Sequence, residues 1–212
     1  MKSFPDSLAD RYRRFKFRYF APNAAHYEEL ATRGQNPDTM VISCSDSRVD
    51  PETIFSAMPG ELFVLRNIAN LVPPYETGGH YHGVSSAIEF AILNLDLKHL
   101  IVIGHSGCGG IKAALNQQAA IQTEAQFISR WMSMLDEARL AVLASHQNAT
   151  PEERQRALEL AGIKQTLKNL RTFPFVRERE ESGKLQLHGA HFDIKTGTLS
   201  VYDNATKEFK AL

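Results

Sequence analysis

Hydrophobic positions along this chain follow two spacings, which predict buried strands alternating with amphipathic helices. Continuous apolar runs at residues 39–44, 62–66 and 100–104 are typical of strands buried in a parallel sheet. Between the last two runs, residues 81–97 carry apolar side chains at helical spacing. That stripe consists of Val84, Ala87, Ile88, Ala91, Ile92 and Leu95. The order strand, helix, strand predicts an α/β fold whose mostly parallel central sheet is covered by helices on both faces.

The two ends of the chain extend this α/β prediction. Residues 3–34 are expected to form an N-terminal helical arm, whose second helix ends at Gly34 because glycine readily caps a helix C-terminus. Near the other end, the strand-like runs 184–194 and 199–202 are joined by the Gly-containing turn 195–198 and predict a hairpin. The sheet is therefore expected to have about four strands plus an edge strand or hairpin.

Helix start signals place the remaining helices. Asp50 followed by Pro51 predicts a short helix with an aspartate cap. Thr150 and Glu153 form a capping box, which starts a long helix that ends before Pro174. Further helices are expected over residues 109–116 and 122–145.

The composition indicates one soluble globular domain. With 212 residues, 43% hydrophobic and 23% charged, the chain is long enough to bury one sizeable core. We divide this single domain, residues 1–212, into three parts. They are the arm at 1–34, a core at 35–120 that holds the candidate metal ligands, and the helices and C-terminal hairpin at 121–212.

Charge and hydropathy argue against several classes of partner. Lys plus Arg and Asp plus Glu number 24 each, so no overall field favours a nucleic acid or an anionic membrane. No apolar run approaches the roughly 20 residues of a membrane helix, and the N-terminus lacks the apolar core of a signal peptide. We therefore expect a cytoplasmic protein with a small-molecule substrate. In that compartment the two cysteines are expected to bind metal or act in catalysis rather than form a disulfide.

Candidate metal ligands follow the first and third predicted strands. Cys44 ends one strand, and His105 and Cys108 follow the other. Sites in parallel sheets lie at the carboxyl ends of the strands, so these side chains are expected to share one site. Two thiolates and one imidazole suit zinc, and three protein ligands leave one coordination position open, as in catalytic sites. The alternative is that both cysteines are ordinary buried thiols.

Asp46 and Arg48 favour the metal site over that alternative. They follow Cys44 by two and four residues, a spacing that allows a bidentate ion pair at the edge of the metal. A surface salt bridge of little energetic worth is the simpler explanation. However, charged side chains directly after a buried strand are unfavourable unless a functional site requires them.

These motifs resemble those of a known enzyme family. The segments Cys44–Val49 and His105–Gly109 are similar to the paired motifs of the beta class of carbonic anhydrases, and the likeness extends through Arg66–Asn70 and much of residues 30–115. The resemblance implies one zinc ion per subunit, held by the two cysteines and the histidine. It also implies reversible hydration of carbon dioxide to bicarbonate and a proton by attack of a zinc-bound hydroxide.

The resemblance also implies roles for the charged pair. Asp46 would accept a hydrogen bond from the zinc-bound water, and Arg48 would hold Asp46 ionised and away from zinc. In relatives with a closed site the aspartate becomes the fourth zinc ligand. The segments Gly34–Pro37 and Leu71–Tyr75 resemble the plant-type branch, whose active site usually stays open.

Substrate contacts are implied in the same way. Gln35 would bind substrate or bicarbonate across a subunit boundary, with help from the amide of Gly109. Phe63, Ile68 and Phe90 would line the apolar pocket for carbon dioxide, with Phe90 where plant-type enzymes often carry tyrosine. The family is built from dimers, so we expect a homodimer or a higher homo-oligomer.

The charge of the ligand set predicts a pH dependence. Two thiolates offset the double positive charge of zinc, whereas an all-histidine site keeps it. Water bound to zinc at this site should therefore have a pKa above the value of roughly 7 in all-histidine sites. Activity is then expected to rise as the pH increases above neutrality.

Three other functions compete with carbon dioxide hydration. A related hydrolase of carbonyl sulfide or carbon disulfide would use the same zinc motif. A structural zinc site or a metal sensor would need a fourth fixed ligand, for which Asp46 is the only candidate. A cysteine phosphatase would need a wider spacing than Cys44 to Arg48 and would leave His105 and Cys108 unexplained.

Overall fold

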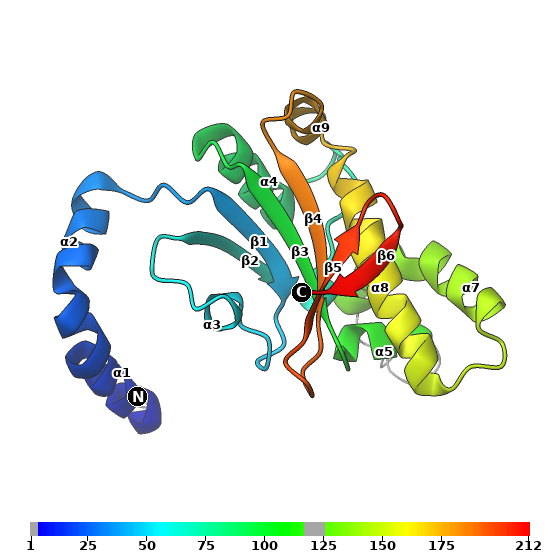
Figure 1. Cartoon of the computed structure of the whole chain (residues 1–212), viewed down its shortest axis with the longest axis horizontal. Helices are drawn as coiled ribbons and strands as arrows, with labels where there is room; N and C mark the ends of the chain where they lie inside the picture. The colour runs from blue at the N-terminus through cyan, green and yellow to red at the C-terminus, as the bar shows by residue number, and fades with distance from the viewer. Residues whose placement is uncertain (1–3, 117–125) are drawn as a thin grey trace.

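A six-stranded, mostly parallel sheet organises the protein, as a computed structural model of residues 4–116 and 126–212 shows (Figure 1). The strand order is β2-β1-β3-β4-β5-β6. The first four of these strands run parallel, and β5 and β6 are antiparallel to their neighbours. The strands are β1 (Thr39–Cys44), β2 (Leu62–Asn67), β3 (His99–His105), β4 (Gln186–Phe192), β5 (Leu199–Asp203) and β6 (Glu208–Ala211). The predicted fold class is confirmed, and β6 is an addition to it.

The N-terminal arm is helical and lies apart from the sheet (Figure 1). Its helix α1 buries no residue. Its second helix ends before Gly34, which has a positive φ of 81° and so confirms the predicted cap. The arm consists of α1 (Asp6–Phe15), the π-helical turn η1 (Lys16–Phe20), the 3₁₀ turn η2 (Ala21–Asn23) and α2 (Ala24–Arg33).

The other helices agree largely with the capping signals. The predicted box is present, because Thr150 Oγ1 accepts from the Glu153 N–H at 3.2 Å and Glu153 Oε2 accepts from the Thr150 N–H at 2.7 Å. Of the helix expected over 122–145, residues 122–125 lie outside the described residues. The helices are α3 (Pro51–Ile54), η3 (Ile68–Asn70), α4 (Gly83–Asn94), α5 (Gly109–Leu115), α6 (Gln126–Met132), η4 (Ser133–Leu135), α7 (Asp136–Ser145), α8 (Pro151–Leu170) and α9 (Pro174–Glu181).

Helix α4 is shorter than the predicted span of residues 81–97. Tyr81 and Asp96 have positive φ angles of 68° and 53°, which are incompatible with a right-handed helix. The apolar stripe itself is confirmed, since Ile88, Ala91 and Ile92 are buried.

The main core joins one face of the sheet to α4, α8 and α9. Met40 and Ile42 of β1 pack there with Leu100 and Val102 of β3. Helix α8 approaches the sheet closely because glycines face it: a Cβ at Gly104 would lie 2.9 Å from Ile163 Cδ1. This contact fixes α8 beside the strand that ends in His105.

The opposite face of the sheet carries a smaller apolar cluster. It consists of Val41, Ile103 and Ala190, with partly buried residues from the strands around them. Within residues 4–116 and 126–212, no helix is long and apolar enough to cross a bilayer.

Candidate metal centre

The three predicted metal ligands converge at the carboxyl ends of the strands. Cys44 is the last residue of β1, His105 is the last of β3, and Cys108 directly precedes α5. Their ligand atoms all lie within 4.8 Å of one another, and the two sulfurs are 3.9 Å apart. All three side chains are buried, so the sequence correctly predicted their proximity.

His105 is oriented as a metal ligand. Its Nδ1 lies 3.0 Å from the Ser106 carbonyl oxygen, which accepts only if Nδ1 carries the proton. The lone pair is then on Nε2, which is buried and has no hydrogen-bond partner among the described residues. A buried nitrogen without a partner, beside two thiols, fits a metal ion, and a backbone carbonyl on the other ring nitrogen is the usual support for such a ligand.

The two thiols influence each other's protonation. The hydrogen bond from Cys108 lowers the pKa of Cys44, against burial and with help from His105. The same contact, together with burial, raises the pKa of Cys108. Burial alone would lower the pKa of His105, but the neighbouring Cys44 outweighs it and the pKa is raised. A metal ion must therefore displace protons to bind all three donors.

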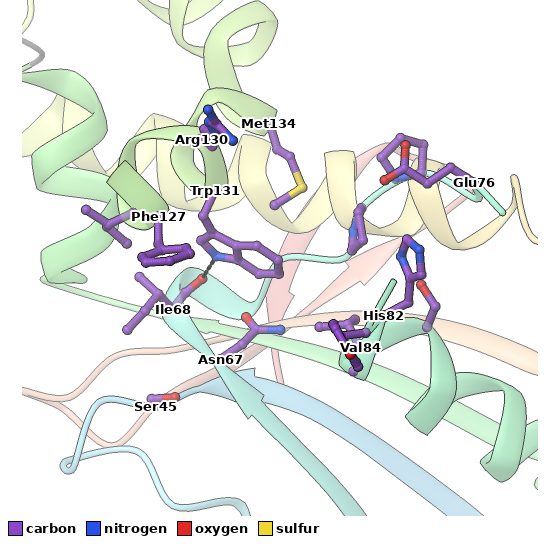
Figure 2. A pocket seen from close by; sticks show the side chains of 16 residues that line it. Ser45, Asn67, Ile68, Glu76, His82, Val84, Phe127, Arg130, Trp131 and Met134 are labelled. Atoms are coloured by element: carbon purple, nitrogen blue, oxygen red, sulfur yellow. Dashed lines mark hydrogen bonds between the residues drawn. The ribbon is translucent and has the colours of Figure 1, made fainter. Parts of the chain in front are cut away.

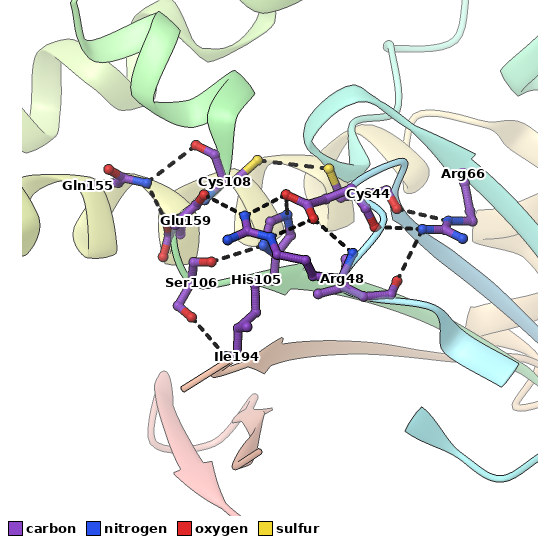
Figure 3. A network of polar contacts seen from close by, with 12 residues as sticks. Cys44, Arg48, Arg66, His105, Ser106, Cys108, Gln155, Glu159 and Ile194 are labelled. Carbon is purple, nitrogen blue, oxygen red and sulfur yellow. Dashed lines mark hydrogen bonds and ion pairs between the residues drawn. The ribbon is translucent and has the colours of Figure 1, made fainter. Parts of the chain in front are cut away.

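Asp46 and Arg48 form the predicted ion pair beside the ligands (Figure 3). Asp46 Oδ2 lies 3.9 Å from His105 Nε2. The hydrogen bonds from Arg48 are the main reason that the pKa of Asp46 is held far below its ordinary value. Asp46 is 18% exposed and Arg48 is 53% exposed, so the carboxylate is directed toward the centre and the guanidinium toward solvent.

Arg66 supports the loop that carries Asp46, a role that the motif alone did not assign. From β2, its Nε donates to the Cys44 carbonyl at 3.0 Å and its Nη2 donates to the Asp46 carbonyl at 2.7 Å. Nη1 adds an ion pair with Asp50 at 3.2 Å. The chain from the first ligand to α3 is therefore held by one side chain.

A strained turn follows β2 next to the metal centre. Ala69 and Asn70 both have positive φ angles, 63° and 50°, which are uncommon outside glycine. The Asn67 side chain stabilises the turn by bonding both the N–H and the carbonyl of Leu71, at 2.9 and 2.8 Å. Such strain is often found at functional sites.

An apolar cavity of about 830 Å³ is lined in part by the residues that directly follow Cys44 and β2 (Figure 2). Ser45, which follows the first ligand, and Ile68 both line it. Trp131 forms part of its wall and donates from Nε1 to the Ile68 carbonyl at 2.8 Å. Phe63 and Phe90 do not line this cavity, and their ring centroids lie 6.0 Å apart in a stacked pair. Of the predicted apolar pocket, only Ile68 borders the cavity.

Gln35 lies at the other end of the sheet. It is exposed and precedes β1, whereas Cys44 is the last residue of that strand. At about 3.3 Å per residue, the six residues of β1 separate the two ends by more than a side chain can span. Gly109, by contrast, begins α5 directly after Cys108.

The chain is similar in sequence to carbonic anhydrases over most of its length. A family model described as carbonic anhydrase matches residues 39–199. Beta carbonic anhydrase 3 of Arabidopsis thaliana is 36% identical over 190 residues, which cover 89% of this chain and 73% of the relative. The chain belongs to the beta class of carbonic anhydrases. Zinc is the metal of this class, and the thiolate and imidazole donors found here fit it.

Other beta carbonic anhydrases agree in sequence and fold. Beta carbonic anhydrase 6 of Arabidopsis thaliana, named as mitochondrial, is 34% identical and covers 92% of this chain and 67% of the relative. The solved structure of the beta-carbonic anhydrase CcaA has a TM-score of 0.92 at 33% identity, over 98% of both chains. A tetrameric beta-carbonic anhydrase of Sordaria macrospora has a TM-score of 0.73 at 29% identity, over 92% of both chains. Since one relative is mitochondrial, the cytoplasmic location stays a prediction.

Proposed function

We propose that this carbonic anhydrase hydrates carbon dioxide reversibly at the Cys44–His105–Cys108 centre, with the Asp46–Arg48 pair acting on the reacting water. The observation that carries this proposal is the position of Asp46 Oδ2, 3.9 Å from His105 Nε2, which has no hydrogen-bond partner in the part of the chain that the structure describes. A carboxylate this close to the metal ligands is within reach of a water at the open coordination position.

Zinc, when bound by these three side chains, would acidify a coordinated water and so supply the nucleophile near neutral pH. The role of Asp46 is to accept a hydrogen bond from that water and to orient it. Arg48 occupies Oδ1 with two N–H groups and Oδ2 with one. The remaining lone pair is on Oδ2, the oxygen nearest to His105.

The arrangement also supports an open site. The aspartate would have to leave Arg48 in order to coordinate the metal itself, at the cost of two charge-assisted hydrogen bonds. Arg48 thus acts as the restraint that leaves one coordination position to water or substrate.

The family resemblance and the positions of two residues support the proposed substrate contacts. Ile68 borders the apolar cavity, and Gly109 places its amide directly after a zinc ligand. Phe63 and Phe90 are proposed to complete the apolar surface in the assembled protein. Gln35 is too distant from its own centre and is proposed to serve that of a second subunit.

A homo-oligomer is part of this proposal. The arm exposes Phe4, Tyr12 and Phe17 at 68%, 60% and 80%, and three aromatic side chains on one short arm favour burial against another subunit. The tetrameric relatives from Sordaria macrospora support self-association. We infer at least a dimer.

The proposal is tested by the stopped-flow rate of carbon dioxide hydration by the zinc-loaded protein. We expect fast turnover that depends on zinc. The control is a Cys44→Ser variant, which removes one ligand and should lack both zinc and activity. Zinc-loaded protein that hydrates no carbon dioxide but releases sulfide from carbonyl sulfide would refute the proposal in favour of the sulfur hydrolase, and protein inactive on both substrates would leave a structural metal.

A further inference from the structure

A buried polar cluster contacts the loop that carries Cys108. Glu159 of α8 and His191 of β4 are 4% and 1% exposed, and His191 Nε2 lies 3.1 Å from Glu159 Oε2. The Arg156 guanidinium contacts the same imidazole, 2.6 Å from Nε2. A buried carboxylate is costly unless it is paired and hydrogen-bonded, and the mechanism above gives this cluster no role.

The other carboxylate oxygen of Glu159 reaches a zinc ligand. Oε1 accepts from the backbone N–H of Cys108 at 3.2 Å (Figure 3). It also accepts from Gln155 Nε2 at 3.1 Å, and that amide nitrogen lies 3.3 Å from the Cys108 carbonyl oxygen. Two neighbouring side chains of α8 thus contact both backbone polar groups of one ligand residue.

The bond to Glu159 also fixes the peptide group that Arg48 uses. The N–H of Cys108 and the carbonyl of Gly107 belong to the same peptide unit. That carbonyl accepts from Arg48 Nη2 at 3.3 Å. The peptide is therefore held on two sides. Glu159 binds the N–H of Cys108, and Arg48 binds the carbonyl oxygen of Gly107. Rotation of this peptide would break both bonds.

The local sequence does not fix this orientation. Gly107 has a φ of +68°, and no atom of residues 4–116 and 126–212 lies within 4 Å of the position that its Cβ would occupy. Glycine adopts positive and negative φ with similar ease, so a turn around Gly107 has alternative backbone conformations available. A bond from outside the turn is needed to select one.

We propose that Glu159 is a positioning residue of the zinc centre. It selects the orientation of the Gly107–Cys108 peptide, and thereby places both the sulfur of Cys108 and the carbonyl that accepts from Arg48. His191 holds the other oxygen of the carboxylate in place, and Arg156 contacts the imidazole of His191. Residues that orient metal ligands through hydrogen bonds typically change metal affinity by about 10–100-fold when replaced.

Three variants separate this role from general stability. Glu159→Met removes both acceptors at similar length, Glu159→Gln keeps one amide oxygen for the Cys108 N–H, and Glu152→Gln changes an exposed glutamate of the same helix as the matched control. The zinc dissociation constant is measured by chelator competition. Visible absorption of the cobalt-substituted protein reports the thiolate geometry independently of turnover.

We expect Glu159→Met to weaken zinc binding by about 10–100-fold and to change the cobalt spectrum. Glu159→Gln should stay within a few-fold of the unaltered chain, and Glu152→Gln should match it. Unchanged affinity and spectrum in Glu159→Met, even with a lowered melting temperature, would show that Glu159 only stabilises the fold. Equal losses in Glu159→Gln and Glu159→Met would assign the effect to charge and overturn the hydrogen-bond argument.

If Glu159→Met does not fold, Gln155→Met tests the same contact from its neighbour. It removes the amide that bonds both Glu159 Oε1 and the Cys108 carbonyl. We expect a smaller shift of zinc affinity and spectrum in the same direction, and no shift would overturn the proposal. Zinc binding by the unaltered chain is measured first, since its absence would refute the metal centre itself.

Discussion

Arg48 binds the carboxylate of Asp46 side-on, with Nε 2.9 Å from Oδ1 and Nη2 2.7 Å from Oδ2. The backbone N–H of Arg48 adds a third bond to Oδ1 at 3.0 Å. Parallel N–H to oxygen bonds of this kind fix direction as well as distance. The free lone pair of Asp46 is therefore directed toward the ligands, and the proposed mechanism depends on that direction.

Asp46→Asn should keep zinc and lose most turnover. An amide has nearly the shape of the carboxylate, but its NH₂ group only donates, so one of the two oxygens that accept from Arg48 and from the water is lost. We expect kcat to fall by about 100-fold, the size of loss that a misplaced reactant can cause, with zinc content unchanged. Stopped-flow hydration and metal analysis measure the two quantities.

Asp96→Asn is the matched control for this substitution. Asp96 is exposed and precedes β3, so it lies at the opposite end of the strand from His105. Its φ of 53° is one that asparagine also adopts. Unaltered rates in Asp46→Asn would remove the aspartate from the mechanism.

Arg48→Lys should shift the pH dependence of activity to higher pH. Lysine cannot make the two parallel bonds of a guanidinium, so Asp46 becomes free to compete for the open metal position. Hydroxide displaces a weakly held carboxylate more readily as the pH rises. We expect kcat to drop mainly below neutrality, with a changed absorption spectrum of the cobalt-substituted variant. A profile that falls uniformly at all pH values would argue against this competition.

The strands and ligands were predictable because their signals are local. A continuous apolar run that ends in Cys44 or His105 predicts a buried strand and also marks the carboxyl end of that strand. The final strand, Glu208–Ala211, was missed because it is short and largely exposed at the sheet edge. Helix α9 was missed because Pro174 was interpreted only as the end of α8, although proline also fits the first position of a helix.

The supporting residues could not be predicted because their partners are distant in sequence. Glu159 lies 51 residues from Cys108 in the sequence. Its helix has two glutamates in the first turn, so the sequence alone suggests that Glu159 is another exposed acidic residue. Close packing of Ile163 against Gly104 and Gly189 brings that part of α8 to the metal loop. The cavity next to Ile68 likewise depends on Trp131, from a helix that joins the site only through tertiary contacts.

Activity of the unaltered enzyme should rise from about pH 6.5 to 9. The hydrogen bonds from Arg48 lower the pKa of Asp46 in the folded protein. The ion pair therefore contributes its full stabilisation above about pH 4, the pKa of aspartate in an unfolded chain. The stabilisation by this ion pair is lost only when the pH falls through the pKa that Asp46 has in the folded protein, which is lower still. Asp46 therefore does not titrate in this window. The rise reflects metal-held water, made less acidic by two thiolate ligands.

The test is the rate of hydration across that range at constant ionic strength. Asp46→Asn offers a further check, because its residual activity should keep the same alkaline rise if Asp46 is not the titrating group. A rate that is already flat below neutrality would contradict the charge argument.

Zinc affinity should increase with pH. The pKa values of Cys108 and His105 are both raised in the metal-free protein, so these groups keep their protons to higher pH and compete with zinc. Each must lose a proton to coordinate. The apparent dissociation constant, measured by chelator competition at about pH 6, 7 and 8, should fall at each step. A pH-independent constant would mean that the donors do not bind as thiolate and neutral imidazole.

Two inactive variants should restore activity when they are mixed, if Gln35 acts on the neighbouring subunit. Gln35→Ala keeps its zinc ligands but lacks the substrate contact, and Cys44→Ser keeps Gln35 but lacks zinc. A mixed dimer contains one complete site, formed by the zinc of the first chain and the glutamine of the second. After co-refolding at equal amounts, half of the molecules should be mixed dimers, so about a quarter of the normal number of sites should be active. If Gln35 served its own chain, every site would lack one component and the mixture would stay as inactive as its parts.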